Sequence, residues 1–173
     1  MRALPLLTCC ALALAAGAAQ AQPDPTDPTA AASPSALSGL TFAASIGAGG
    51  ETGMTQGKAG LLELEVAAGW EHQPTRLRPE LALALGVAPE SSIAIRPGLR
   101  AGLAQVPIWL RAAIDFSTAR DEGMHTRWLL FGAAWELQFN TSLAFDLGLD
   151  FGIPLASSSG VPLMLRAGGT FRL

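Results

Sequence analysis

The chain has 173 residues, of which 50% are apolar and only 14% are charged, and its formal net charge is −3. This composition is too apolar for an intrinsically disordered chain and offers no basic field that would hold nucleic-acid phosphates. The charges are also too few for the solvated surface of an ordinary soluble domain, so a membrane-spanning structure is expected.

Residues 1–21 have the organisation of a secretory signal peptide. Arg2 supplies the positive start, an apolar run follows, and small residues precede a cleavage site after Ala21. Cleavage there leaves a mature chain of net charge −4 without cysteine, because both cysteines, Cys9 and Cys10, lie in the signal. Lipidation at Cys9 or Cys10 is the alternative, although the apolar run before them is short.

Residues 22–37 contain four prolines and show no apolar periodicity, which predicts a disordered, solvated tail. Residues 38–173 lack any uninterrupted apolar stretch of about 18 residues, so membrane-spanning helices are excluded there. Apolar and small or polar residues instead alternate with a period of two, which indicates strands whose two faces meet different surroundings.

The alternation predicts eight strands in chain order, at residues 39–48, 61–71, 77–87, 93–103, 107–116, 128–137, 142–153 and 161–173. Pro79 is a mild fault in the third strand, and Pro97 in the fourth is tolerable at a β-bulge. In the sixth strand both faces are apolar, so apolarity alone does not choose the inner face.

Fourteen charged residues within these segments all lie on the face opposite the large apolar side chains. They are Glu63, Glu65, Glu71, Arg78, Glu80, Arg96, Arg100, Arg111, Asp115, Glu136, Asp146, Asp150, Arg166 and Arg172. Alternation also fits a soluble, lipocalin-like barrel with its apolar face inward. However, the charged face is otherwise mostly Ala and Gly without any Lys, which suits a narrow interior, whereas the Leu, Ile, Val, Phe and Trp of the other face suit lipid. We therefore predict an all-β fold, an eight-stranded antiparallel up-and-down transmembrane β-barrel over residues 38–173.

The predicted connections alternate roughly between long and short. Those after the first, third, fifth and seventh strands span about 12, 5, 11 and 7 residues, and the others about 5, 3 and 4. The long connections are expected to face outside and the short ones the periplasm.

The pattern resembles the small eight-stranded outer-membrane barrels of Gram-negative bacteria, the family of OmpX and of the OmpA membrane domain. The last strand, with Leu163, Leu165, Ala167 and Gly169 before Phe171 and Leu173, is similar to the carboxy-terminal assembly signal of that family. The chain departs from the family pattern in ending on Leu173 rather than Phe, and in having no Tyr. The aromatic belts would therefore rest on Trp70, Trp135, Phe116, Phe139, Phe151 and Phe171.

The resemblance implies a monomer in the outer membrane. Its expected partners are outer-membrane lipid and lipopolysaccharide, with the barrel-assembly machinery and periplasmic chaperones engaged during biogenesis. No nucleic-acid partner is expected, since the mature chain is acidic.

Catalytic, cofactor and metal sites are not predicted. His72 and His125 fall in connections on opposite sides of the membrane and cannot share a metal or a proton relay. The stretch 53–59 differs from a phosphate loop at Thr52 and after Lys58. Residues 140–142 (Asn-Thr-Ser) predict a tight turn.

A buried charge persists only when it is paired, so the fourteen inward charges predict an Arg/carboxylate network that closes the lumen. The function expected is a non-enzymatic outer-membrane protein with a structural or surface-interaction role. A small-ligand binding or transport barrel is the main alternative, and a soluble lipocalin-like binder or an outer-membrane lipid-modifying enzyme are further ones.

Overall fold

The fold was analysed in a computed structural model that describes residues 39–54, 57–118, 123–156 and 159–173. These residues belong to one compact unit, Leu37–Leu173. The predicted signal peptide and nearly all of the Pro-rich tail belong to the other unit, Met1–Ala36, and both lie outside the described residues. In the described part of the chain, no helix is long and apolar enough to cross a membrane.

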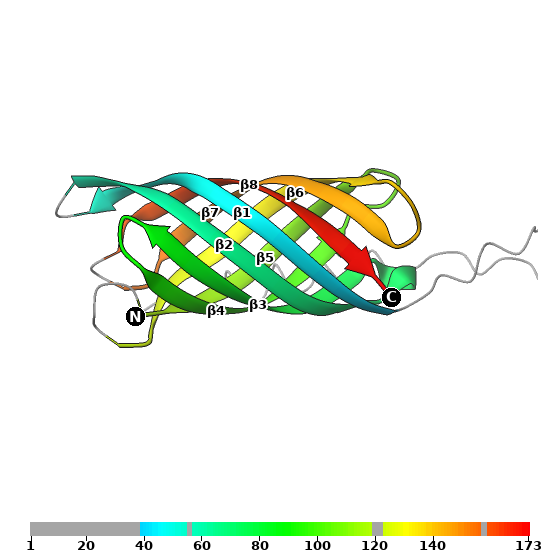
Figure 1. The fold of residues 1–173 in the computed structure, drawn as a ribbon, viewed down its shortest axis with the longest axis horizontal. Coiled ribbons are helices and arrows are strands. Elements are labelled where there is room, and N and C mark those ends of the chain that lie inside the picture. Colours follow the sequence, from blue (N-terminus) through cyan, green and yellow to red (C-terminus); the bar gives the residue numbers. More distant parts are fainter. Residues whose placement is uncertain (1–38, 55–56, 119–122, 157–158) are drawn as a thin grey trace, which may run out of the picture. The chain divides into compact units, whose positions relative to one another are not determined.

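Eight strands form a closed barrel in which each strand is antiparallel to the next and the last pairs with the first (Figure 1). The strands are β1 (Gly39–Met54), β2 (Gly57–Glu71), β3 (Leu77–Ala88), β4 (Ser92–Gly102), β5 (Ile108–Ser117), β6 (His125–Gln138), β7 (Leu143–Pro154) and β8 (Val161–Arg172). Closure pairs every strand on both sides, which removes the exposed edges of an open sheet. The predicted fold class is confirmed.

The barrel has two distinct ends. The terminal end carries the start of β1, the end of β8 and the turns 72–76, 103–107 and 139–142, and the first turn contains the short 3-10 helix η2 (Gln73–Thr75). The hairpin end carries the connections 55–56, 89–91, 118–124 and 155–160. Figure 1 shows β8, in red, ending beside η2 at the terminal end.

The predicted alternation of long and short connections is wrong at the first hairpin and at the turn 89–91, which is shorter than the neighbouring turns 72–76 and 103–107. Residues 49–60 were expected to form a long loop, but the pairing of β1 with β2 continues through Gly49↔Leu61, Glu51↔Ala59 and Met54↔Gly57. β8 supports this extension from the other side, up to the pair Thr52↔Val161. The sequence pattern could not predict this strand extension, because a glycine-rich segment shows no alternation of apolar side chains.

Pro97 lies in β4 without the expected bulge. The register between β4 and β5 is the same before and after it, from Ile95↔Phe116 to Gly98↔Ala113, and only the pairs at Arg96 and Pro97 are missing. Because a proline nitrogen cannot donate a hydrogen bond, the ladder is interrupted locally rather than shifted.

A register shift does occur between β5 and β6, where Asp115 pairs with Trp128 but Phe116 pairs with Thr126. Arg127 is the extra residue, and both it and Trp128 are buried. Strict alternation would have placed these neighbours on opposite faces, so the β-bulge adds an inward arginine that periodicity could not predict.

The two faces of the wall differ as predicted, with large apolar residues outside and charges inside. Leu83, Leu147 and Ile153 are about half exposed, whereas inward Ala82, Ala144 and Met164 are at most 1% exposed. In β6 the inner face is that of Trp128, Leu130 and Glu136. A soluble barrel would have the reverse arrangement.

Candidate functional site: the charged lumen

The charged side chains that the sequence places on the inner face are enclosed by the barrel. Thirteen of the fourteen are buried, and Arg172 at the terminal end is partly exposed. Their ion pairs divide them into a terminal cluster and a central cluster. A separate ion pair, Glu51–Arg127, is not among the fourteen and lies near the hairpin end. Asp146 belongs to none of these.

The terminal cluster consists of Glu71, Arg78, Glu136 and Arg172, which come from β2, β3, β6 and β8. Each arginine contacts both glutamates: Arg78 Nη2 lies 2.6 Å from Glu71 and 3.4 Å from Glu136, and Arg172 reaches them at 2.9 and 2.5 Å. The Arg78 guanidinium also stacks 4.3 Å from the ring centroid of Trp109. Two positive and two negative side chains thus form a balanced ring across the terminal end of the lumen.

The central cluster joins six strands: β2, β3, β4, β5, β7 and β8. Its members are Glu63, Glu65, Glu80, Arg96, Arg100, Arg111, Asp115, Asp150 and Arg166. Arginine suits this arrangement because its planar guanidinium carries five donors that can serve several carboxylates at once.

Arg96 makes the densest contacts in the central cluster. Its Nη1 and Nη2 donate to the two oxygens of Glu63 at 2.6 and 2.8 Å, a bidentate pair. Its Nη1 also reaches Glu65 at 2.9 Å, and its Nε donates to Asp115 at 2.7 Å. One guanidinium, 2% exposed, therefore binds three carboxylates.

Arg111 and Arg166 connect Glu65 with Asp150 from two directions. Arg111 lies 2.9 Å from Glu65, 2.8 Å from Glu80 and 3.3 Å from Asp150. Arg166 lies 3.1 Å from Glu65 and 2.9 Å from Asp150, and its Nη2 reaches Glu63 at 2.7 Å. Opposite Asp150, position 132 is glycine, and a Cβ there would collide with the Asp150 carboxylate. The backbone thus leaves room for the long charged groups to meet.

Three predicted members of the network have fewer than two ion-pair partners among the described residues. Asp115 is paired with Arg96 alone. Arg100 has one carboxylate partner, Glu80, at 2.7 Å. Asp146 makes no ion pair with any described residue and accepts a hydrogen bond from the Thr170 hydroxyl at 2.6 Å. Whether a side chain points inward follows from its odd or even position along the strand. Which charged residue it then pairs with depends on the register between strands, which the sequence does not reveal.

A buried pair near the hairpin end was missed by the sequence. Arg127 donates to Glu51 at 2.7 Å, and the other Glu51 oxygen accepts from the backbone N–H of Gly160 at 2.6 Å. The Trp128 indole donates to the carbonyl of the same glycine at 3.0 Å, and Arg127 stacks on the Trp128 ring. Only the extended hairpin and the β6 bulge bring these residues into the lumen.

The other residues considered for chemistry lie apart from these clusters. His72 bonds to Thr75 at 2.9 Å at the terminal end, whereas His125 begins β6 at the hairpin end and bonds to the Gly123 carbonyl at 3.0 Å. The predicted tight turn is confirmed, because the Asn140 side chain accepts from the N–H groups of Ser142 and Leu143. Of the stretch 53–59, residues 53–54 end β1 and residues 57–59 begin β2, and residues 55–56 lie outside the described ones.

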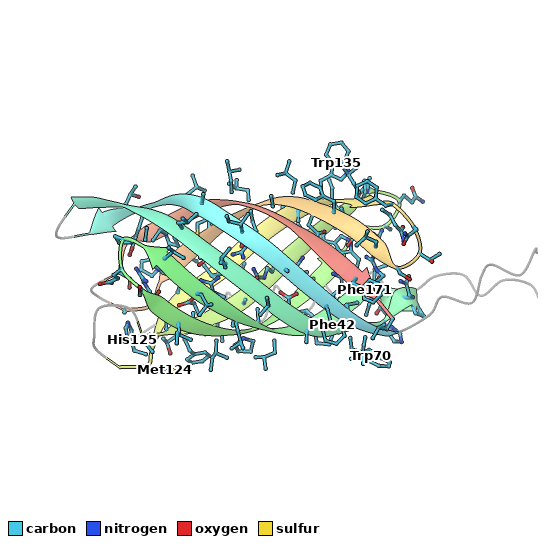
Figure 2. All side chains as sticks on the ribbon, in the orientation of Figure 1. Phe42, Trp70, Met124, His125, Trp135 and Phe171 are labelled. Atoms are coloured by element: carbon cyan, nitrogen blue, oxygen red, sulfur yellow. The ribbon has the colours of Figure 1, made fainter. Side chains whose placement is uncertain are left out.

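The proposed assembly signal lies on the outer face. Phe171 is paired with Phe42 of β1 and Leu143 of β7, and both Phe171 and Leu173 are exposed. Figure 2 shows Phe171, Phe42 and Trp70 toward the terminal end and Met124 toward the other. Their role in assembly stays a prediction.

Aromatic residues of the outer face gather at the terminal end instead of forming two even belts. The register aligns Trp70 with Leu40 near the start of β1, and Trp135 with Ile108 at the start of β5. Two of the predicted belt residues lie elsewhere: Phe116 is the next-to-last residue of β5, at the hairpin end, and Phe151 is 47% exposed on the outer face of β7, where it stacks on Phe131 with ring centroids 5.6 Å apart.

A closed eight-stranded barrel with an apolar outside and an ion-paired inside defines the class of small transmembrane β-barrels. The comparison with solved structures gives the same fold. A structure from the de novo design of transmembrane β-barrels matches with a TM-score of 0.52 and 12% identity, covering 78% of this chain and 95% of that one. Neisserial surface protein A (NspA) matches with a TM-score of 0.54 and 14% identity, covering 78% of this chain and 99% of that one.

The predicted resemblance to small eight-stranded outer-membrane barrels is thereby confirmed at the level of fold. No protein-family model matches the sequence, and no curated protein matches it.

Proposed function

We propose that the protein is a non-enzymatic outer-membrane barrel with a structural or surface-interaction role, whose lumen is closed by its Arg/carboxylate network. The central cluster is the observation that carries this proposal. Its ion pairs cross the lumen between strands that are not neighbours in the wall, for example from β2 to β4 and from β2 to β8 through Arg166. Side chains held in this way occupy the space that a conducting pore needs.

The outer surface supports a place in the membrane. Leu81, Val66 and Leu165 are each more than half exposed, and exposed apolar side chains follow every strand. In lipid every backbone polar group needs an internal partner, and a closed barrel supplies one without exposed edges. Together with the predicted signal peptide and the fold, this face supports an outer-membrane monomer surrounded by lipid and lipopolysaccharide.

The chemistry of the clusters supports a role without catalysis. An arginine side chain stays protonated in proteins and has no acceptor, so it serves as neither a general base nor a nucleophile. The carboxylates of the central and terminal clusters are each bound to arginine. Such carboxylates are held as structural anions rather than as a free acid and base pair.

Planar-bilayer recording tests the closed lumen. The unmodified protein is expected to give no stable ohmic current, and folding is checked by a change in electrophoretic migration on boiling. Arg111→Ala, which removes one arginine from three carboxylates, is expected to admit ions, while Glu90→Ala in the exposed 89–91 turn should stay silent. A stable ohmic channel in the unmodified protein would contradict the proposal and favour the transport alternative.

A further inference from the structure

A small void lies beside four members of the central cluster, Arg100, Arg111, Asp150 and Arg166. Its volume is about 20 Å³, and its lining includes Arg100, Trp109, Asp146 and Gly148. The void is therefore bordered by Asp146, the one inward carboxylate that lacks an ion pair among the described residues, and by Arg100, the one arginine of the central cluster with a single carboxylate partner.

Four buried polar atoms of the lining have no hydrogen-bond partner among the described residues, but two of them, Arg100 Nε and Arg111 Nη2, lie 2.7 and 2.9 Å from the carboxylates of Glu80 and Glu65. The other two atoms belong to Asp146 and Trp109. The Oδ1 atom of Asp146 has no partner, although the other oxygen accepts from Thr170. The indole N–H of Trp109 has none either. The two residues are 9% and 2% exposed, so bulk solvent does not satisfy these groups. A buried donor or acceptor without a partner is costly, and such groups in folded proteins are nearly always satisfied.

The unpaired Trp109 N–H and Asp146 Oδ1 determine which ligand the void can bind. Its ligand must accept a hydrogen bond from the Trp109 indole and donate one to the Asp146 carboxylate. A metal cation or an ammonium ion cannot accept, and a bare anion cannot donate. A water molecule does both, and a void of this size holds about one water.

We propose that the void binds one ordered water molecule, which accepts from Trp109 Nε1 and donates to Asp146 Oδ1. This water joins β5 to β7 at a point where no direct side-chain bond joins Trp109 to Asp146. The inference depends neither on the membrane in which the barrel resides nor on whether the lumen conducts.

Nuclear magnetic resonance of the whole protein in detergent micelles tests the site through the indole N–H groups. The chain has four tryptophans, and each indole signal is assigned from its own Trp→Phe variant. Trp128 is the internal control, because it is as buried as Trp109 but donates to the Gly160 carbonyl. We expect a cross-relaxation signal between water and the Trp109 indole proton, and none for Trp128. Absence of that signal for a resolved Trp109 would overturn the proposal.

Two substitutions at position 146 sharpen the test. Asp146→Asn keeps an acceptor oxygen and is expected to retain the Trp109 water signal, whereas Asp146→Leu should abolish it. Persistence of the signal in the leucine variant would show that Asp146 does not hold the water. If the leucine variant does not fold, the comparison of Trp109 with Trp128 in the unmodified protein decides the matter alone.

Discussion

At the scale of single residues, the arginines of the lumen differ in how many carboxylates depend on them. Arg96 binds Glu63, Glu65 and Asp115, and among the described arginines it is the only partner of Asp115. Arg100 binds only Glu80, which Arg111 also binds. Removing one partner of a buried ion pair leaves the other charge desolvated without compensation. The cost of losing an arginine should therefore follow the number of carboxylates that it leaves unpaired.

Arg96→Ala is predicted to lower the free energy of unfolding by about 3 to 5 kcal/mol, because its carboxylates are buried. Arg100→Ala should cost clearly less, and the exposed Glu90→Ala should stay within about 0.5 kcal/mol of the parent. Urea unfolding in lipid vesicles measures all three. Equal losses for Arg96 and Arg100 would show that leaving Asp115 without an arginine does not set the cost.

The inward direction of the charged residues could be predicted from the sequence, but their partners could not. The period-two alternation places Glu63 and Arg166 inside, yet their contact depends on the register of strands that are distant in sequence. Glu51 and Arg127 were not predicted to lie in the lumen. The first lies in a glycine-rich strand extension, and the second is the extra residue of a bulge.

At the scale of the strand, each element of the wall has one lumenal and one outer face. In β7, Leu147 is 53% exposed, whereas Ala144 is 1% exposed. The same strand therefore offers a matched pair of positions with opposite surroundings.

Leu147→Arg is predicted to destabilise the barrel by about 2 to 4 kcal/mol near the bilayer midplane, because it turns a charge toward hydrocarbon. Ala144→Ser, on the polar inner face, should be nearly neutral. Refolding equilibria in lipid vesicles give both values. Similar effects at the two positions would contradict the assignment of the faces.

Strand positions were more predictable than strand ends. The alternation located all eight strands, and the bounds of β4, β5 and β7 differ from those predicted by one residue at each end. The end of β1 and the start of β2 were missed by several residues, because neighbouring strands extend the ladder through Gly49, Gly50 and Gly60, which carry no side-chain pattern. Backbone pairing decided these ends.

At the scale of the whole barrel, an even number of strands returns both ends of the barrel domain to the same side. The proposed orientation places this terminal end in the periplasm and the hairpin end outside the cell. Loop length no longer argues for it, since the first hairpin has only residues 55–56 between its strands.

Lys58 provides the test of orientation, because it is the only lysine of the chain and belongs to the first residues of β2 at the hairpin end. A membrane-impermeant amine reagent on intact cells is predicted to label it, and Lys58→Arg should remove the label. Labelling that occurs only after the outer membrane is breached would show that the orientation is the opposite one. A strain without long surface polysaccharide excludes shielding as the cause.

The ion pairs of β8 have a consequence for how the barrel is made. Arg166 and Arg172 bind Glu63 and Glu71, partners that precede them by 103 and 101 residues. These bonds cannot form until the final strand is in place, and contacts of such long range slow folding. Glu63 and Glu71 have earlier partners in Arg96 and Arg78, but the two guanidinium groups of β8 reach them only when the barrel closes. Closing the wall and completing the charge balance of its interior are therefore the same step.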